Sequence, residues 1–122
     1  MYKVLPQSEG PALGLMISGK IDITEEQEMI ELAEKVLAEH DKLNLLVIVG
    51  ENVWASLEAA YADLRWITTH LKNVAKLAIV TDSKTLGWLV EQDAKIARHL
   101  GIGERHFATD ELEEAWTWTK SA

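Results

Sequence analysis

Two uninterrupted runs of aliphatic residues constrain the fold of this chain more than any other feature. They are residues 45–49 (LLVIV) and 77–80 (LAIV). A strand that is apolar on both sides, without alternation, is typical of a parallel sheet covered on both faces. The segments that follow the two runs, about residues 56–71 and 83–100, repeat apolar residues at helical spacing. Strands that alternate with helices predict an α/β domain with right-handed crossovers and a mainly parallel sheet.

The N-terminal part predicts two further strands and a helix. Residues 2–5 and 12–18 have strand character, and the turn between them contains Gly10 and Pro11, so they should form an antiparallel hairpin. A helix with an acidic outer face follows, with Met29, Ile30, Ala33, Val36 and Leu37 on its apolar side. We expect Thr24 to cap this helix in a Thr-x-x-Gln capping box with Gln27.

The helix that starts near Ser83 has a polar residue inside its apolar stripe. The stripe comprises Leu86, Leu89, Ile96 and Leu100, and Asp93 falls within it. An unpartnered buried carboxylate is costly, so we expect the helix to break there, with Asp93 capping its second half. The alternative is a polar group that faces the interior. Gly101 and Gly103 would end the helix.

The C-terminal part adds a weaker strand at residues 105–108 and a last helix. That helix begins at Thr109 or Asp110, and Asp110 with Glu113 would form a second capping box. We therefore predict one domain over residues 1–122: a mixed, mostly parallel sheet of about five strands flanked by four helices. The first strand is the antiparallel exception.

The residue types that carry most chemistry are absent or scattered. Without cysteine the chain has no disulfides, thiolate catalysis or zinc–sulfur sites. None of the histidines, at positions 40, 70, 99 and 106, is three or four residues from another, the spacing of metal ligands on one helical face. Gly50 follows a predicted strand, but Glu51 puts a negative charge where a phosphate-binding loop would hold its phosphate. No serine lies in a Gly-x-Ser-x-Gly nucleophile elbow. We expect a protein that is not an enzyme, with no metal site and no cofactor.

The net charge of −8, from 12 basic and 20 acidic residues, restricts the classes of partner that the protein can bind. Nucleic-acid binding relies on clustered Lys and Arg, so nucleic acid is excluded as a partner. The negative charge also disfavours simple electrostatic docking to anionic lipid, although a chain with this net charge can still have a local basic patch. The N-terminus lacks the features of a secretory signal peptide, and the longest apolar run is far short of the roughly 20 residues that span a bilayer. We expect a cytoplasmic protein, with peripheral membrane contact as an option.

Five tryptophans, against one phenylalanine and two tyrosines, are an unusual use of aromatic residues. Trp116 should lie in the core and Trp118 over a sheet edge. Trp66 is nine positions after Leu57, which at 100° per residue places it opposite the apolar stripe of its own helix.

The side of that helix with Trp66 has two interpretations. A single exposed aromatic residue is common. Alternatively, Trp66 belongs to a second apolar face that forms a groove, a dimer contact or a membrane-facing patch, because tryptophan is enriched at such boundaries. Residues that would share this face are Ala59, Ala62 and His70, with Trp54 in the preceding loop and Trp88 on the next helix.

Several short segments, in order, resemble the SpoIIAA-like proteins, which are bacterial relatives of STAS domains. The segments are residues 18–20 (SGK), 44–49, Trp54 with 63–65 (DLR), 77–82, 88–89 (WL) and 107–115. The resemblance implies a small mixed sheet flanked by four helices. STAS-type antagonists of anti-sigma factors are phosphorylated at a serine in an Asp-Ser-Ser-Gly-like loop after the central strand. Here only Ser56 lies near that place, without the acid before it or the glycine after it, and a helix N-cap explains it better.

The SpoIIAA-like proteins also resemble the lipid-carrying CRAL-TRIO fold, in which a mobile helix covers an apolar pocket. The helix with Trp66 would suit that role by analogy of fold. We therefore expect a non-enzymatic binding module for a small apolar ligand or a membrane surface. The alternative is a STAS-like regulatory module, or a homodimer, that uses the same face. The candidate binding residues are Trp54, Ser56, Ala59, Ala62, Trp66, His70 and Trp88.

Overall fold

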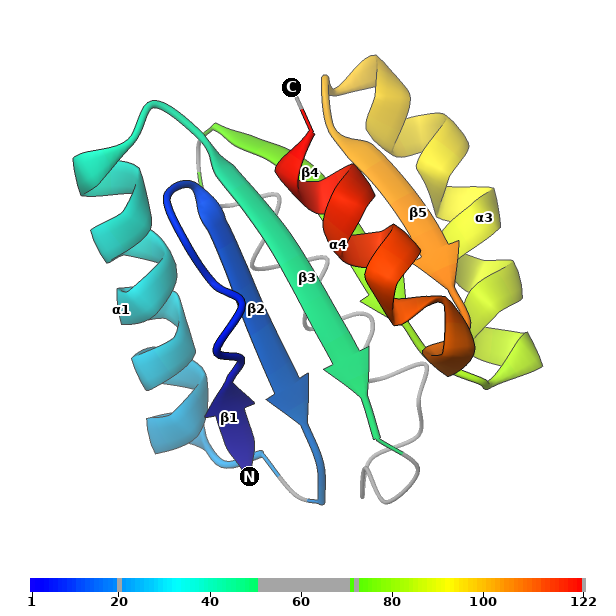
Figure 1. Ribbon diagram of the computed structural model, residues 1–122, viewed down its shortest axis with the longest axis horizontal. Helices are drawn as coiled ribbons and strands as arrows, with labels where there is room; N and C mark the ends of the chain where they lie inside the picture. The colour runs from blue at the N-terminus through cyan, green and yellow to red at the C-terminus, as the bar shows by residue number, and fades with distance from the viewer. Residues whose placement is uncertain (20, 51–70, 72, 122) are drawn as a thin grey trace.

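The computed structural model describes residues 1–19, 21–50, 71 and 73–121 (Figure 1). The strands are β1 (Tyr2–Val4), β2 (Ala12–Ile17), β3 (Leu43–Val49), β4 (Val74–Val80) and β5 (Gly103–Phe107). The helices in these ranges are α1 (Ile23–Glu39), α3 (Lys84–His99) and α4 (Leu112–Lys120), with a short 3-10 turn, η1 (Thr109–Glu111). The fourth predicted helix, about residues 56–71, falls on residues 51–70 and so lies outside the described residues.

The sheet has the order β1-β2-β3-β4-β5, so each strand lies beside its predecessor in the chain. β1 pairs with β2 antiparallel, and the remaining pairs are parallel. The predicted mixed sheet of five strands with an N-terminal hairpin is therefore confirmed. When successive parallel strands are added in one direction across a sheet, right-handed connections place all the connecting helices on the same face. Accordingly α1 and α3 pack on one face of the sheet, and α4 covers the other (Figure 1).

Alternation along the central strands divides the core into two layers. Leu45 and Val47 of β3 point into the layer under α1 and α3, together with Leu77 of β4. Leu46 points the other way, into the layer under α4, where Trp116 is 8% exposed and packs with Phe107. The prediction that Trp116 is a core residue is confirmed. Trp118 lies over the edge strand, with its ring centroid 6.0 Å from that of Phe107.

Two helix starts differ from the prediction. The N-cap of α1 is Asp22, whose carboxylate accepts from the Glu25 N–H at 2.7 Å. Thr24 is therefore not the cap: an Asp-x-x-Glu box two residues earlier performs the same function. Asp110 does not cap α4 either, because the chain first makes η1, where the Glu111 carboxylate accepts from the Ala108 N–H at 2.8 Å.

α3 is continuous, so the predicted break at Asp93 is wrong. Its buried side is formed by Leu86, Val90 and Ala97, which leaves Asp93 half-buried at the margin of that side. The stripe expected from the sequence was rotated relative to this side, because it left out Val90 and Ala97 and included Ile96 and Leu100, which are exposed. The helix starts near Ser83 as predicted, and the Ser83 side chain caps it. Gly101, with φ of 79°, ends it in a Schellman motif.

Candidate functional site

The carboxyl ends of β3 and β4 form a recess at the start of α3. In open parallel sheets this edge is where ligands bind. The recess has a volume of about 330 Å³, and its lining residues are Ile48, Val49, Gly50, Thr81, Asp82, Ser83 and Thr109.

Hydrogen bonds within the protein hold the carboxylate of this recess. Asp82 accepts from the Thr109 hydroxyl at 2.6 Å and from the Thr109 N–H at 2.9 Å. These bonds, the hydroxyl first, lower the pKa of Asp82 below its usual 3.8. A carboxyl that acts as a general acid or base near neutral pH needs the opposite shift. Asp82 is therefore a structural tie between β4 and η1.

The contacts of His106 also indicate a structural role. Its Nε2 lies 2.9 Å from the Thr81 carbonyl oxygen, and its ring packs against Gly87 of α3. His40 caps the end of α1, and His99 is exposed at the end of α3. Within the described ranges, no three His, Cys, Asp or Glu side chains gather as a metal site would need.

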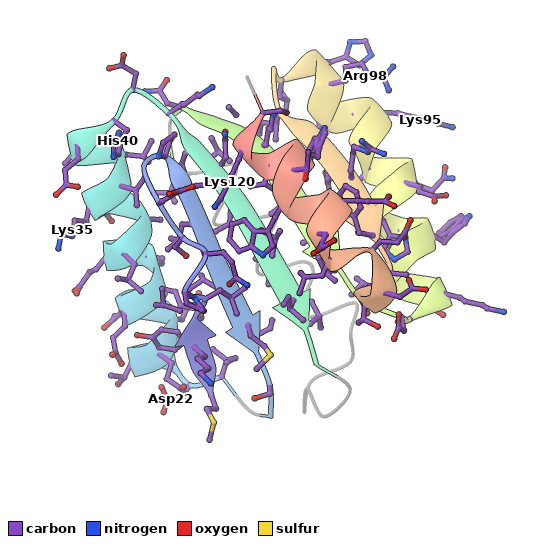
Figure 2. All side chains as sticks on the ribbon, viewed as in Figure 1. Asp22, Lys35, His40, Lys95, Arg98 and Lys120 are labelled. Atoms are coloured by element: carbon purple, nitrogen blue, oxygen red, sulfur yellow. The ribbon has the colours of Figure 1, made fainter. Side chains whose placement is uncertain are left out.

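The outer side of α3 exposes large apolar side chains. Trp88 is 59% exposed, and Ile96 and Leu100 are each 61% exposed. Spacings of eight and four residues place them along one inclined row of the helix. Lys84, Lys95 and Arg98 are exposed on the same helix, and Figure 2 shows Lys95 and Arg98 projecting away from the sheet. We call these six residues the α3 patch.

The net charge of α3 is opposite in sign to that of the whole molecule. α3 has three of the chain's 12 basic residues and two of its 20 acidic ones, a net charge of +1 where the whole chain has −8. α1, on the same face of the sheet, has six glutamates and one lysine, a net charge of −5. The two helices therefore present opposite charges to a partner.

Of the binding residues predicted from the sequence, only Trp88 is among those described. The others, Trp54, Ser56, Ala59, Ala62, Trp66 and His70, lie outside the described residues. Ile96 and Leu100 were missed because they were assigned to the buried stripe. The basic residues interleaved with them, Lys95 and Arg98, were the available signal that this side of the helix faces water.

None of the helices described is long and apolar enough to cross a membrane. The five-stranded mixed sheet with helices on both faces defines a small α/β domain. The chain belongs to the SpoIIAA-like family, whose model matches residues 12–120.

A solved structure supports the fold. It is an uncharacterised protein of the DUF3478 family with a SpoIIAA-like fold from Shewanella loihica PV-4. The two chains are 20% identical, the alignment covers 97% of this chain and 93% of that one, and the TM-score is 0.59. At this identity the likeness shows the fold alone. A comparison with curated proteins found no match.

Proposed function

We propose that the protein is a non-enzymatic regulatory module that binds an acidic surface of a partner protein through the α3 patch. The observation that carries the proposal is the row of exposed apolar residues Trp88, Ile96 and Leu100 flanked by basic side chains. Large apolar side chains that are exposed together on one side of a helix, with polar groups around them, are typical of interaction sites. The relation of SpoIIAA-like proteins to STAS domains points in the same direction.

A protein partner fits the patch better than a lipid surface does. Helices that lie in membranes combine a wide apolar face with many basic residues. α3 has three exposed large apolar residues and a net charge of only +1. The acidic remainder of the molecule would be repelled by anionic lipid, whereas a partner with a local acidic patch meets α3 alone. Charge complementarity would steer the encounter, and Trp88 would supply the buried anchor.

The hypothesis of an apolar ligand rested on the side of the helix with Trp66. That side lies outside the described residues, so the α3 patch carries the proposal instead.

Photo-crosslinking in cells tests the proposal at a defined position. A photoreactive residue at Gln92, which is exposed between Trp88 and Ile96, should link to one acidic protein. The same residue at Gln27, exposed on α1, is the control and should not. With the purified partner, Trp88→Ala and Lys95→Glu should each weaken binding about tenfold, since central tryptophans and charge reversals have effects of that order. Lys35→Glu on α1 should leave the affinity for the partner unchanged.

Three results would contradict the proposal. Crosslinking of Gln92 to a second copy of the chain, with a dimer in light scattering, would assign the patch to self-association. Binding to vesicles of anionic lipid that Trp88→Ala abolishes would assign it to membranes. Equal crosslinking from Gln27 and Gln92 would show that the α3 patch does not bind the partner specifically.

A further inference from the structure

A second recess lies at the opposite end of the sheet, where β2 and β3 begin. It has a volume of about 440 Å³ and lies between the β1–β2 hairpin and the end of α4. We call it the hairpin pocket; its lining residues are Glu9, Gly10, Pro11, Ala12, Lys42, Asn44, Lys120 and Ser121. Figure 2 labels Lys120 at the end of α4 beside this hairpin.

Backbone hydrogen bonds hold the hairpin side of the pocket in place. The N–H of Glu9 donates to the Ala12 carbonyl and the N–H of Ala12 donates to the Glu9 carbonyl, both at 2.9 Å. Gly10, with φ of 55°, makes the tight turn between them. The N–H of Asn44 donates to the Pro11 carbonyl at 2.8 Å and ties the turn to β3. The wall is thus formed before any ligand arrives.

Two lysines, Lys42 and Lys120, line this pocket, and a third, Lys76, bonds to its lining residue Ser121, in a chain whose net charge is −8. Lys120 is paired with the Glu9 carboxylate at 2.8 Å. Lys76, behind the pocket, donates to the carbonyls of Trp118 and Ser121 and to the Ser121 hydroxyl, all uncharged acceptors, at 2.7 Å.

Lys42 has no ion-pair partner in the part of the chain that the structure describes. Burial, and then the charge of Lys42, lower the pKa of Lys76, as expected where cations lie close together. Lys42 and Lys76 are therefore close enough for their charges to repel each other, and among the described residues neither is paired with a carboxylate.

Asn44 contributes a buried acceptor at the same place. The residue is 2% exposed, and its Nδ2 donates to the Thr119 carbonyl at 2.9 Å. Its Oδ1 is buried and has no hydrogen-bond partner among the described residues. A buried acceptor without a donor is uncommon and calls for an explanation. A ligand that carries both negative charge and a hydroxyl group would satisfy Asn44 and the lysines together.

We propose that the hairpin pocket binds a small hydroxylated organic phosphate. The phosphate lies between Lys42 and Lys120, whose two charges match the charge of about −2 on a phosphate monoester. A ligand hydroxyl donates to Asn44 Oδ1. Glu9, whose side chain is 73% exposed, holds Lys120 when the pocket is empty and swings out when the phosphate replaces it. The hairpin pocket is separate from the α3 patch, and the two proposals are tested independently.

A nuclear magnetic resonance titration of the ¹⁵N-labelled protein with glycerol 1-phosphate tests the site. The amide signals of Ala12, Asn44 and Ser121 should shift together, and inorganic phosphate should bind more weakly because it lacks the carbon-bound hydroxyl. Lys42→Gln and Lys120→Gln should each weaken binding about tenfold, the usual effect of losing one charge-assisted hydrogen bond. Lys35→Gln, which removes a positive charge from α1, is the matched control.

Glu9→Gln gives the sharpest test, because it should tighten binding roughly threefold by releasing Lys120. Glu34→Gln makes the same charge change on α1 and should have no such effect. The proposal is overturned if glycerol 1-phosphate causes no shifts up to roughly 10 mM, or if the α1 variants alter binding as much as the pocket variants do. Equal affinity for inorganic phosphate would overturn the role given to Asn44.

Discussion

The ring of His106 lies so close to Gly87 that the helix has no room for a side chain there. A Cβ at position 87 would lie 2.7 Å from His106 Cε1 and 2.9 Å from Nδ1. The ring is also held by the contact of its Nε2 with the Thr81 carbonyl. Gly87 thus allows α3 to pack directly on β5.

Gly87→Ala is expected to lower the free energy of unfolding by about 1 kcal/mol, because overpacking costs more than the gain in helix propensity. In the background of His106→Ala the clash is absent, so the same substitution should stabilise by up to about 1 kcal/mol. Urea unfolding of the four proteins measures both effects. The same sign in both backgrounds would show that His106 is not the obstacle.

Gly14 of β2 has the corresponding relationship with Trp116 of α4. A Cβ at Gly14 would overlap the indole ring of Trp116 and approach Leu5 Cδ1 to 3.0 Å. We expect Gly14→Ala to cost about 3 kcal/mol, the upper part of the range for overpacking, because the ring is buried and confined. Trp116→Ala should cost about 3–5 kcal/mol. Trp88→Ala, an exposed site, should stay within about 0.5 kcal/mol of the parent protein in chemical unfolding.

The bonds between Thr109 and Asp82 predict a specific pH dependence. Because the native pKa of Asp82 is lowered, its contribution to stability is fully present above 3.8 and is lost as pH falls through the lower native value. Thr109→Val removes the hydroxyl donor, so the pKa of Asp82 should rise towards 3.8 and the acid-side loss of stability should become smaller. Titration of the Asp82 carboxyl carbon by NMR measures the pKa. Thr117→Val, which removes a hydroxyl bonded to the Glu113 carbonyl, should leave it unchanged.

Asn44 and Lys76, opposite each other on β3 and β4, both donate to backbone carbonyls at the end of α4. Lys76→Met keeps the length of the side chain and should cost about 1–2 kcal/mol at neutral pH through lost hydrogen bonds. The native pKa of Lys76 is lowered from 10.5, so the unfolded state holds the proton more tightly. Stability should therefore rise with pH between the native pKa and 10.5.

The methionine variant should lose this rise, because it has no group that titrates there. Guanidinium unfolding at roughly pH 8 and roughly pH 10 compares the two proteins. An identical pH dependence in both would show that Lys76 does not titrate differently on folding.

The sequence predicts most of the fold because the signals for it are local. Unbroken aliphatic runs indicate the central strands, the turn at Gly10 indicates the hairpin, and Ser83 and Gly101 mark the ends of α3. The errors arose where burial depends on distant partners. Asp93 lies at the margin of a face formed by Leu86, Val90 and Ala97, and the local pattern did not separate this face from the neighbouring side with Ile96 and Leu100.

The candidate sites were less predictable than the fold. Trp88 was found because tryptophan is informative wherever it occurs, whereas Ile96 and Leu100 looked like core residues until the helix was oriented. The hairpin pocket brings together Glu9, Lys42 and Lys120 from three distant parts of the chain. Only the pairing of strands and the packing of α4 bring them together.

The sequential strand order has a consequence for synthesis on the ribosome. Since each strand pairs with the one made just before it, the sheet can grow in the direction of translation without inserting a strand between two others. Its two faces are not protected at the same time. The side with Leu46, Ala78 and Phe107 stays open to water until α4 has been made. A nascent chain stalled before Leu112 would expose that face, and we expect such chains to depend on chaperones.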